Sequence, residues 1–371
     1  KQYQFMGCMM KAESLRKIIL GAVSAMAIIY GITIGLTGSM TLASQNVWAQ
    51  EQGFVPGNAL GNTGDAELWR QIRQGVSGTV SIPDKKAGVL VQADGDRFRL
   101  VRNGPLSSYG GWAMLGIIII LGIFYTIRGR IQIESGRSGR TVTRFNDLER
   151  FTHWLTASSF IVLAITGLNT LYGKFVLMPI IGKSAFAGFT YLSKLAHNYI
   201  GFAFMIGIAL MVVIWIRQNL PDKHDLNWIA KGGGMFTKGS HPPAKKFNFG
   251  QKMIFWTVVL GGLSLSLTGI CLLYPFEFTL YSDTFALMNV FGFSLPTDLT
   301  PLQESQLALI FHPIVALIMI VIIIAHIYIG SVGMDGAIEA VTTGEVDENW
   351  AREHHSLWLD EINNKQSDPA E

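Results

Sequence analysis

The most constraining feature of this sequence is one apolar run, FHPIVALIMIVIIIAHIYIG, at residues 311–330. A helix of about 20 apolar residues spans the hydrocarbon core of a bilayer, which is roughly 30 Å thick. The run carries His312 and His326, 14 residues apart. On a helix, 14 steps return the second ring to within about 40° of the first and separate the two by roughly 21 Å. We therefore expect a polar site near each edge of a membrane, on one helix face. Polar groups at such depth are costly and usually functional.

The composition agrees with a membrane protein and excludes several classes of function. The chain is 49% hydrophobic and 15% charged, and its mean hydropathy is +0.34. Its net charge of +3 comes without a basic block interleaved with aromatics, so no nucleic-acid partner is expected. There are two cysteines and no C-x-x-C-H motif, which excludes covalently attached c-type haem. An iron–sulfur cluster needs about four thiolates, so none is expected in this chain.

The apolar runs divide the sequence into segments. Spans are predicted near 110–127, 152–171, 196–217, 253–274 and 309–332. A basic and then apolar stretch from Met10, followed by the small residue Ala49, predicts a secretory signal or an uncleaved anchor. The predicted organisation is a signal or anchor (1–49), a polar extension (50–108), an extra membrane helix (109–128), a four-helix domain (129–333) and a tail (334–371). Alternation around a Gly-Asp turn predicts a small hairpin at 87–104.

Lysine and arginine in the loops predict the orientation in the membrane. The 128–150 loop has six arginines and the 217–252 loop has seven lysines and arginines, whereas the 275–308 loop has neither residue. The two basic loops and the tail are therefore expected in the cytoplasm. The polar N-terminal segment and the other two loops are expected outside, and a secretory signal requires the same placement of the N-terminal segment.

The eight histidines fall into two groups. Four lie in polar stretches and are predicted to be solvent-exposed: His224, His241, His354 and His355. The other four lie in or at the ends of spans. Their predicted depths match in two pairs, an outer pair of His197 with His312 and an inner pair of His153 with His326.

Matched imidazoles on facing helices are what two axial ligands of a haem require. Each histidine alone is as well explained by a core hydrogen bond, but four in two layers favour haem. A proton relay is the alternative, although it normally uses Asp or Glu at depth, which these spans lack. A tetrahedral metal site is disfavoured because the layers are too far apart. Glycines within the spans suit either a flat cofactor or ordinary helix packing: Gly167, Gly201, Gly207, Gly269 and Gly330. Two haems stacked through a membrane would carry electrons from a partner subunit to a quinone.

Four segments together resemble the cytochrome b (gamma) subunit of respiratory formate dehydrogenase, in its long bacterial form. They are RFNDLERFTHWLTASSFIVLAITGLN, KLAHNYIGFAF, FNFGQKMIFW and the run that opened this section. The resemblance covers about residues 140 to 350. It implies an all-α, four-helix bundle with two b haems, whose iron is held by the same outer and inner pairs. It also implies a menaquinone pocket near the inner haem, formed by Asn248, Gly250 and Gln251. Without the resemblance, Asn248 and Gly250 would be explained as a helix N-cap and a turn.

The resemblance further implies the location and the function: a bacterial inner membrane, with the N-terminal segment in the periplasm and the tail in the cytoplasm. The chain would take electrons from periplasmic formate oxidation and pass them through both haems to menaquinone, in anaerobic respiration. It would not itself oxidise formate. Its partners would be an iron–sulfur (beta) subunit and a molybdenum- or tungsten-containing catalytic (alpha) subunit. The N-terminal extension departs from the short members of the family, and its role is open. A cytochrome b subunit of a membrane-bound hydrogenase or of a thiosulfate reductase is an alternative, as is a proton-coupled transporter with a histidine relay.

Overall fold

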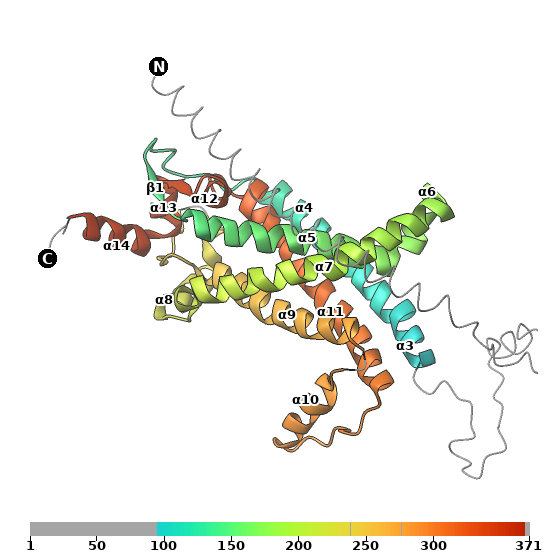
Figure 1. The fold of residues 1–371 in the computed structure, drawn as a ribbon. Helices are drawn as coiled ribbons and strands as arrows, with labels where there is room; N and C mark the ends of the chain where they lie inside the picture. The colour runs from blue at the N-terminus through green and yellow to red at the C-terminus, as the bar shows by residue number, and fades with distance from the viewer. Residues whose placement is uncertain (1–94, 238, 276, 368–371) are drawn as a thin grey trace, which may run out of the picture. The chain divides into compact units, whose positions relative to one another are not determined.

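The computed structural model describes residues 95–237, 239–275 and 277–367 (Figure 1). The predicted signal or anchor and most of the polar extension lie outside these residues. Residues 101–367 belong to one compact unit, and residues 95–100 belong to a second unit. The prediction of a hairpin at 87–104 is wrong in its described half, because α3 (Gly95–Val101) is helical there and is followed by a π-turn, η2 (Arg102–Leu106).

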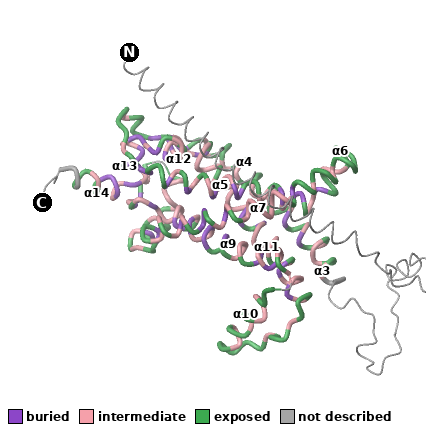
Figure 2. The backbone as a smooth tube through the Cα atoms, viewed as in Figure 1, coloured by how far each residue is buried: buried purple, intermediate pink, exposed green. Residues whose placement is uncertain are grey.

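In the part of the chain that the structure describes, five long helices are each apolar enough to cross a membrane, which confirms the predicted helical, multi-pass membrane fold. They are α4 (Ser107–Arg128), α5 (Asp147–Val176), α7 (Lys183–Trp215), α9 (Phe249–Leu273) and α11 (Pro301–Tyr328). Large apolar side chains lie on their outer surfaces, as Ile127 and Val213 do at 82% and 80% exposure. Figure 2 shows exposed and intermediate residues along much of each helix. Such a surface suits lipid rather than water.

Polar capping residues determine where three of these helices begin. The side chains of Asn146, Asn248 and Thr300 each accept a hydrogen bond from the backbone N–H three residues later. The side-chain oxygen of a Glu or Gln at that later position accepts a hydrogen bond from the cap residue's own backbone N–H. This reciprocal arrangement satisfies backbone groups that a helix start leaves unpaired. The first turns of α5, α9 and α11 are therefore encoded locally.

Residues 172–195, which connect the predicted spans at 152–171 and 196–217, are mostly helical. The helix α5 continues to Val176, the short helix α6 (Met178–Ile181) follows, and α7 begins at Lys183. Packing between α5 and α7 extends into this region, where Asn169 donates a side-chain hydrogen bond to Thr190 at 3.3 Å. Because α5 and α7 pack against each other there, both helices extend beyond the apolar spans predicted from the sequence.

The four core helices pack in sequence order around a shared core. The helix α5 lies against α7, α7 against α9, and α9 against α11, while α4 lies against α11 (Figure 1). Direct packing between α11 and α5 is sparse. The core includes Phe160, Phe204, Ile208, Val259 and Met319. The most extensive packing is within two helix pairs, α5 with α7 and α9 with α11. Histidine side chains of α11 nevertheless lie close to rings on both α5 and α7.

A folded layer, here called the cap, closes one end of the bundle. It comprises residues 129–146, 239–248 and 334–367. Its strands β1 (Thr141–Thr143) and β2 (Glu345–Asp347) pair antiparallel. The described C-terminal part also contains α12 (Glu339–Thr342), which precedes β2, and α13 (Glu348–His354) and α14 (Ser356–Ser367), which follow it. The neighbouring helix α8 (Lys223–Ala230) lies at the same end, and α10 (Leu280–Asn289) lies in the 275–300 connection (Figure 1).

The cap corrects one prediction about the histidines. His355 has 0% exposure, so its predicted solvent exposure is wrong, and His354 is only partly exposed. The physical reason is a small core in which Val346, Ala351 and Leu359 are also fully buried. The polar composition of the tail concealed this short apolar pattern.

Candidate haem-binding site

The outer pair is assembled from α7 and α11. The rings of His197 and His312 have centroids 6.2 Å apart and an interplanar angle of 63°. Both side chains are half-buried. The two rings face each other across the bundle, as their predicted depths required.

Two threonine hydroxyls fix the orientation of these rings. Thr166 and Thr268 each donate a hydroxyl hydrogen bond to the backbone carbonyl four residues earlier, at 2.8 Å. Their oxygen lone pairs are then available to accept from Nδ1–H of His197 at 2.8 Å and of His312 at 2.9 Å. A histidine that donates through Nδ1 keeps its Nε2 lone pair free for a metal. Sequence reasoning missed these threonines, although each precedes a glycine in an apolar span, as T-G.

The glycines in the spans have different roles. A Cβ at Gly167 would lie 3.5 Å from Cε1 of His197, and a Cβ at Gly269 would lie 3.7 Å from Cε1 of His312. These glycines therefore lie against the outer pair. At Gly201 and Gly330, each four residues after a predicted ligand, a Cβ would meet nothing within 4 Å. Gly207 instead permits close helix packing, because a Cβ there would lie 2.5 Å from Thr156 Oγ1.

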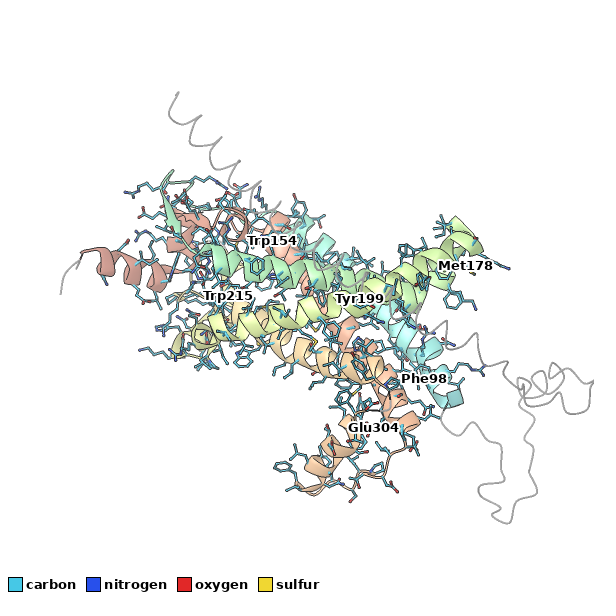
Figure 3. All side chains as sticks on the ribbon, viewed as in Figure 1. Phe98, Trp154, Met178, Tyr199, Trp215 and Glu304 are labelled. Carbon is cyan, nitrogen blue, oxygen red and sulfur yellow. The ribbon has the colours of Figure 1, made fainter. Side chains whose placement is uncertain are left out.

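The inner pair joins α5 and α11 at the cap end. The rings of His153 and His326 have centroids 6.5 Å apart and an interplanar angle of 57°. Trp154, which follows His153, donates its indole N–H to the cap carbonyl of Val341 at 2.8 Å. Figure 3 shows Trp154 and Trp215 toward the cap end and Glu304 at the other end of α11. Unlike the outer rings, His153 has a buried Nδ1 with no hydrogen-bond partner among the described residues.

Both pairs fit a haem iron with two axial imidazoles. A metal–imidazole bond is about 2.0–2.1 Å long, so two such bonds and the two ring radii separate the ring centroids by roughly 6 Å. The observed separations are 6.2 and 6.5 Å. No cluster of three or more His, Cys, Asp or Glu side chains occurs in the described part of the chain. Two ligands suit a porphyrin, which supplies the other nitrogen ligands itself, better than a protein-only metal site.

A buried apolar layer separates the two pairs. Phe160, Phe204 and Met319 each lie seven residues from a predicted ligand, and their exposures are 9%, 3% and 1%. The rings of Phe160 and Phe204 are 6.0 Å apart. The backbone of α9 approaches this layer at Gly261 and Gly262. A Cβ at Gly261 would lie 2.6 Å from Met319, and a Cβ at Gly262 would lie 3.2 Å from Phe204. None of these side chains can carry a proton, which disfavours a relay between the layers.

Among the buried acids of the described residues, Glu149 and Glu304 lie at the starts of membrane-spanning helices, α5 and α11, outside the predicted spans. Glu149 accepts hydrogen bonds from the indole of Trp215 and from Lys246. Glu304 accepts from the backbone N–H groups of Tyr281 and Ser282. These carboxylates have fixed structural partners, so they supply no acid between the histidine layers.

The three residues predicted for the quinone pocket lie at the start of α9. Asn248 and Gln251 form a capping box through their side-chain oxygens. A Cβ at Gly250 would lie 2.9 Å from the ring of Trp228, so close packing accounts for this glycine. The side-chain NH₂ groups of Asn248 and Gln251 take no part in the capping box. Contact with a quinone stays a prediction.

Comparison with known proteins places the chain in a family. The sequence model of the prokaryotic cytochrome b561 family matches residues 144–344, more than half of the 371 residues. The formate dehydrogenase cytochrome b556(fdo) subunit of Escherichia coli K12 is 28% identical over 62% of this chain and 98% of that protein. The nitrate-inducible cytochrome b556(Fdn) subunit of the same strain is 24% identical over 60% of this chain and 92% of that protein. A formate dehydrogenase cytochrome b556 subunit of Haemophilus influenzae is 28% identical over 62% and 87%.

These relatives confirm the resemblance predicted from the sequence. They are named as cytochrome subunits of formate dehydrogenases, and the family match contains all four predicted ligands. The histidine pairs, the apolar helices of the described residues and the family match all indicate a membrane cytochrome b. This chain is a multi-pass membrane cytochrome b that belongs to the prokaryotic cytochrome b561 family.

Proposed function

We propose that this chain is the membrane subunit of a formate dehydrogenase and that it moves electrons through two b haems to menaquinone. The observation that carries the proposal is the pair of opposed histidine layers, 14 residues apart on α11. His197 and His312 would hold the outer haem, and His153 and His326 the inner haem. A haem bound at each site supplies reversible one-electron chemistry.

The polypeptide's contribution is to position the ligands and to exclude water. The threonine hydroxyls hold both outer imidazoles with Nε2 available. The layer of Phe160, Phe204 and Met319 keeps protons from following the electrons across the membrane. Separation of the two charges is what allows electron transfer to contribute to a membrane potential.

The partners follow from the relatives. Formate dehydrogenase cytochrome b subunits work in complexes that oxidise formate, so we infer an iron–sulfur subunit and a molybdenum- or tungsten-containing subunit beside this chain. The basic loops indicate that the cap faces the cytoplasm. The electron donor would then meet the outer haem, and menaquinone would bind near the inner haem and the start of α9.

The quinone chemistry at the inner end needs electrons and protons together. One menaquinone takes up two electrons and two protons to become the quinol. The NH₂ groups of Asn248 and Gln251 would donate hydrogen bonds to a quinone carbonyl, and Gly250 would let the ring approach the backbone. The chain itself would not oxidise formate.

A spectroscopic experiment tests the haem assignment. A reduced-minus-oxidised spectrum of the purified protein, with haem measured as the pyridine haemochrome, is expected to show two b haems per chain. His312→Ala should remove the outer haem and His326→Ala the inner haem, whereas the control His224→Ala should keep both. Absence of haem from the wild-type protein would overturn the proposal.

A second experiment identifies the electron donor. The native complex, isolated through a tag on this chain, is supplied with formate or with hydrogen. We expect haem reduction by formate alone. Reduction by hydrogen but not formate would assign the chain to a hydrogenase.

A further inference from the structure

Unsatisfied polar atoms gather in the interior of the cap. Four buried side-chain nitrogens there have no partner among the described residues: Arg144 Nη1, Trp350 Nε1, His354 Nε2 and His355 Nε2. Buried polar groups without partners are rare in native proteins, and internal water is the usual reason for them. The Trp350 ring connects this set, because it lies 5.2 Å from the ring of His354 and 5.3 Å from that of His355.

Arg144 is the most unusual member. It is 3% exposed, and no described carboxylate forms an ion pair with it. Its guanidinium lies 5.1 to 5.3 Å from the rings of Phe145, Trp350 and Trp358. One nitrogen, Nη2, donates to the carbonyl of Lys246 at 2.5 Å and lies 3.4 Å from Oε1 of Gln251. The guanidinium thus connects the cap interior to the start of α9, with Nη1 left as a free donor.

His355 provides an acceptor beside these donors. Its Nδ1–H donates to the carbonyl of Lys245 at 2.8 Å, so Nε2 carries a lone pair. Within the described residues that lone pair has no donor, whereas Arg144 and Trp350 each have an N–H without an acceptor. A water molecule both donates and accepts, so internal water would satisfy both kinds of atom.

A surface pair leads toward this interior. His241 Nε2 lies 3.2 Å from Oε2 of Glu134, and these side chains are 32% and 37% exposed. The ring of His241 lies 6.5 Å from that of His354. A sequence of polar groups therefore runs from solvent at Glu134 to the first turn of α9.

We propose that the cap holds a chain of internal water that carries protons from the Glu134–His241 surface pair, past His354 and His355, to Arg144 and Gln251. The inference rests on the proposed function, in which two protons and two electrons convert one menaquinone to its quinol at the start of α9. The electrons come from formate through the bundle, and the protons come from the aqueous phase at the cap. His355 and Arg144 are positioning residues, because they order water rather than touch the quinone.

The charges around the histidines are compatible with this role. Burial lowers the pKa of His354 to about 4, against the opposing effect of Glu353 and Glu134 and with the help of His241 and Arg144. Burial, and then the positive charge of Arg144, also lowers the pKa of His355. Both rings are therefore neutral near pH 7. Neutral rings leave lone pairs available to order water.

The first test is structural and independent of activity. A map of the wild-type complex that resolves ordered water is expected to show water bonded to Arg144 Nη1, Trp350 Nε1 and His355 Nε2. A dry cluster at these atoms would overturn the proposal.

The second test separates electron transfer from proton delivery. In the formate dehydrogenase complex, His355→Phe removes the acceptor and fills its space, whereas His355→Gln keeps a polar group. Haem reduction by formate should be unchanged in both variants. Haem reoxidation by a soluble menaquinone analogue should slow by about tenfold or more in His355→Phe, increasingly as the pH rises, and much less in His355→Gln. The control His224→Phe, on α8, should match wild type.

The outcomes are distinguishable. Equal reoxidation rates in wild type and His355→Phe across pH would reject the water chain and leave the proposed function intact. Haems that formate reduces but that no menaquinone analogue reoxidises would overturn the proposed function and the water chain with it. If His355→Phe does not assemble, the water map tests the proposal instead: ordered water at Arg144, Trp350 and His355 supports the water chain, and its absence overturns it.

Discussion

The outer and inner histidine layers offer the same ligand chemistry, but their rings are held differently. Both outer rings donate through Nδ1 to a threonine hydroxyl, and each ring lies against a glycine. In the inner layer, Nδ1 of His153 is buried without a partner among the described residues, and the adjacent Trp154 is tied to the cap. The outer layer is preorganised within the bundle, whereas the inner layer depends on its surroundings at the cap end.

The difference corresponds to the two tasks that we propose. An electron entry site needs only a fixed ligand geometry, and second-sphere hydroxyls provide it. A site beside a quinone must also exchange protons with water. The unsatisfied nitrogens of the cap lie at the inner end, and the outer pair, whose Nδ1 atoms are both hydrogen-bonded, lies at the opposite end. This comparison leads to four predictions.

The largest expected effect comes from filling the open space beside each layer. Gly330→Leu should abolish the inner haem alone, and Gly201→Leu the outer haem alone, because a side chain would occupy the space that lies one helical turn beyond a ligand. The pyridine haemochrome should fall by half in each variant. Gly116→Leu on α4, where a Cβ also meets nothing within 4 Å, serves as the control. Full haem content in both variants would show that these glycines face lipid instead.

The second prediction removes the hydroxyls that distinguish the outer layer. Thr166→Val or Thr268→Val should weaken haem binding at the outer site by about 10- to 100-fold and leave the inner site unchanged. The loss of an acceptor at Nδ1–H makes the imidazole a weaker donor to ferric iron, so the outer midpoint potential should rise. Haem retention during dilution and a redox titration would measure both effects. Thr170→Val, whose hydroxyl bonds only a backbone carbonyl, is the matched control.

The sequence was sufficient for the membrane fold, the family and the pairing of the four histidines. Apolar runs and the 14-residue spacing depend on helix geometry alone, so periodicity reveals them. The threonines were missed because a hydroxyl in an apolar helix ordinarily bonds its own backbone, and only the structure shows its second bond to a ring. That ambiguity cannot be removed from a single sequence.

The cap was missed for a different reason. Its core uses a few side chains contributed by distant segments, such as Arg144 against Trp350 and Trp358. No local periodicity marks contacts that are about 200 residues apart in the sequence. The predicted hairpin failed similarly, since alternation over a few residues does not exclude a helix such as α3. The signal or anchor lies outside the described residues and stays a prediction.

The third prediction uses pH to separate the cap from the bundle. The pKa of His354 falls from 6.5 to about 4 on folding because the ring is buried, and that of His355 is also lowered. The unfolded cap therefore binds more protons than the folded cap below pH 6.5. Stability is fully present above pH 6.5 and declines as the pH falls, and the loss that His354 contributes reaches about 2 kcal/mol at pH 5. Limited proteolysis of the cap at pH 7.5, 6 and 5 would measure the decline, and His354→Gln should flatten it. An unchanged slope in that variant would contradict the assignment.

The smallest expected effect compares the helix starts at the two ends of the bundle. Thr300→Ala removes the cap of α11 at the outer end, and Asn248→Ala removes the cap of α9 at the inner end. Each should lower the free energy of unfolding by about 1 kcal/mol, because a backbone N–H loses its acceptor. Thr300→Ala should have no further effect, whereas Asn248→Ala should also raise the concentration of menaquinone analogue needed for half-maximal haem reoxidation. Equal quinone dependence in the two variants would reduce Asn248 to a structural cap and place the quinone carbonyl at another donor.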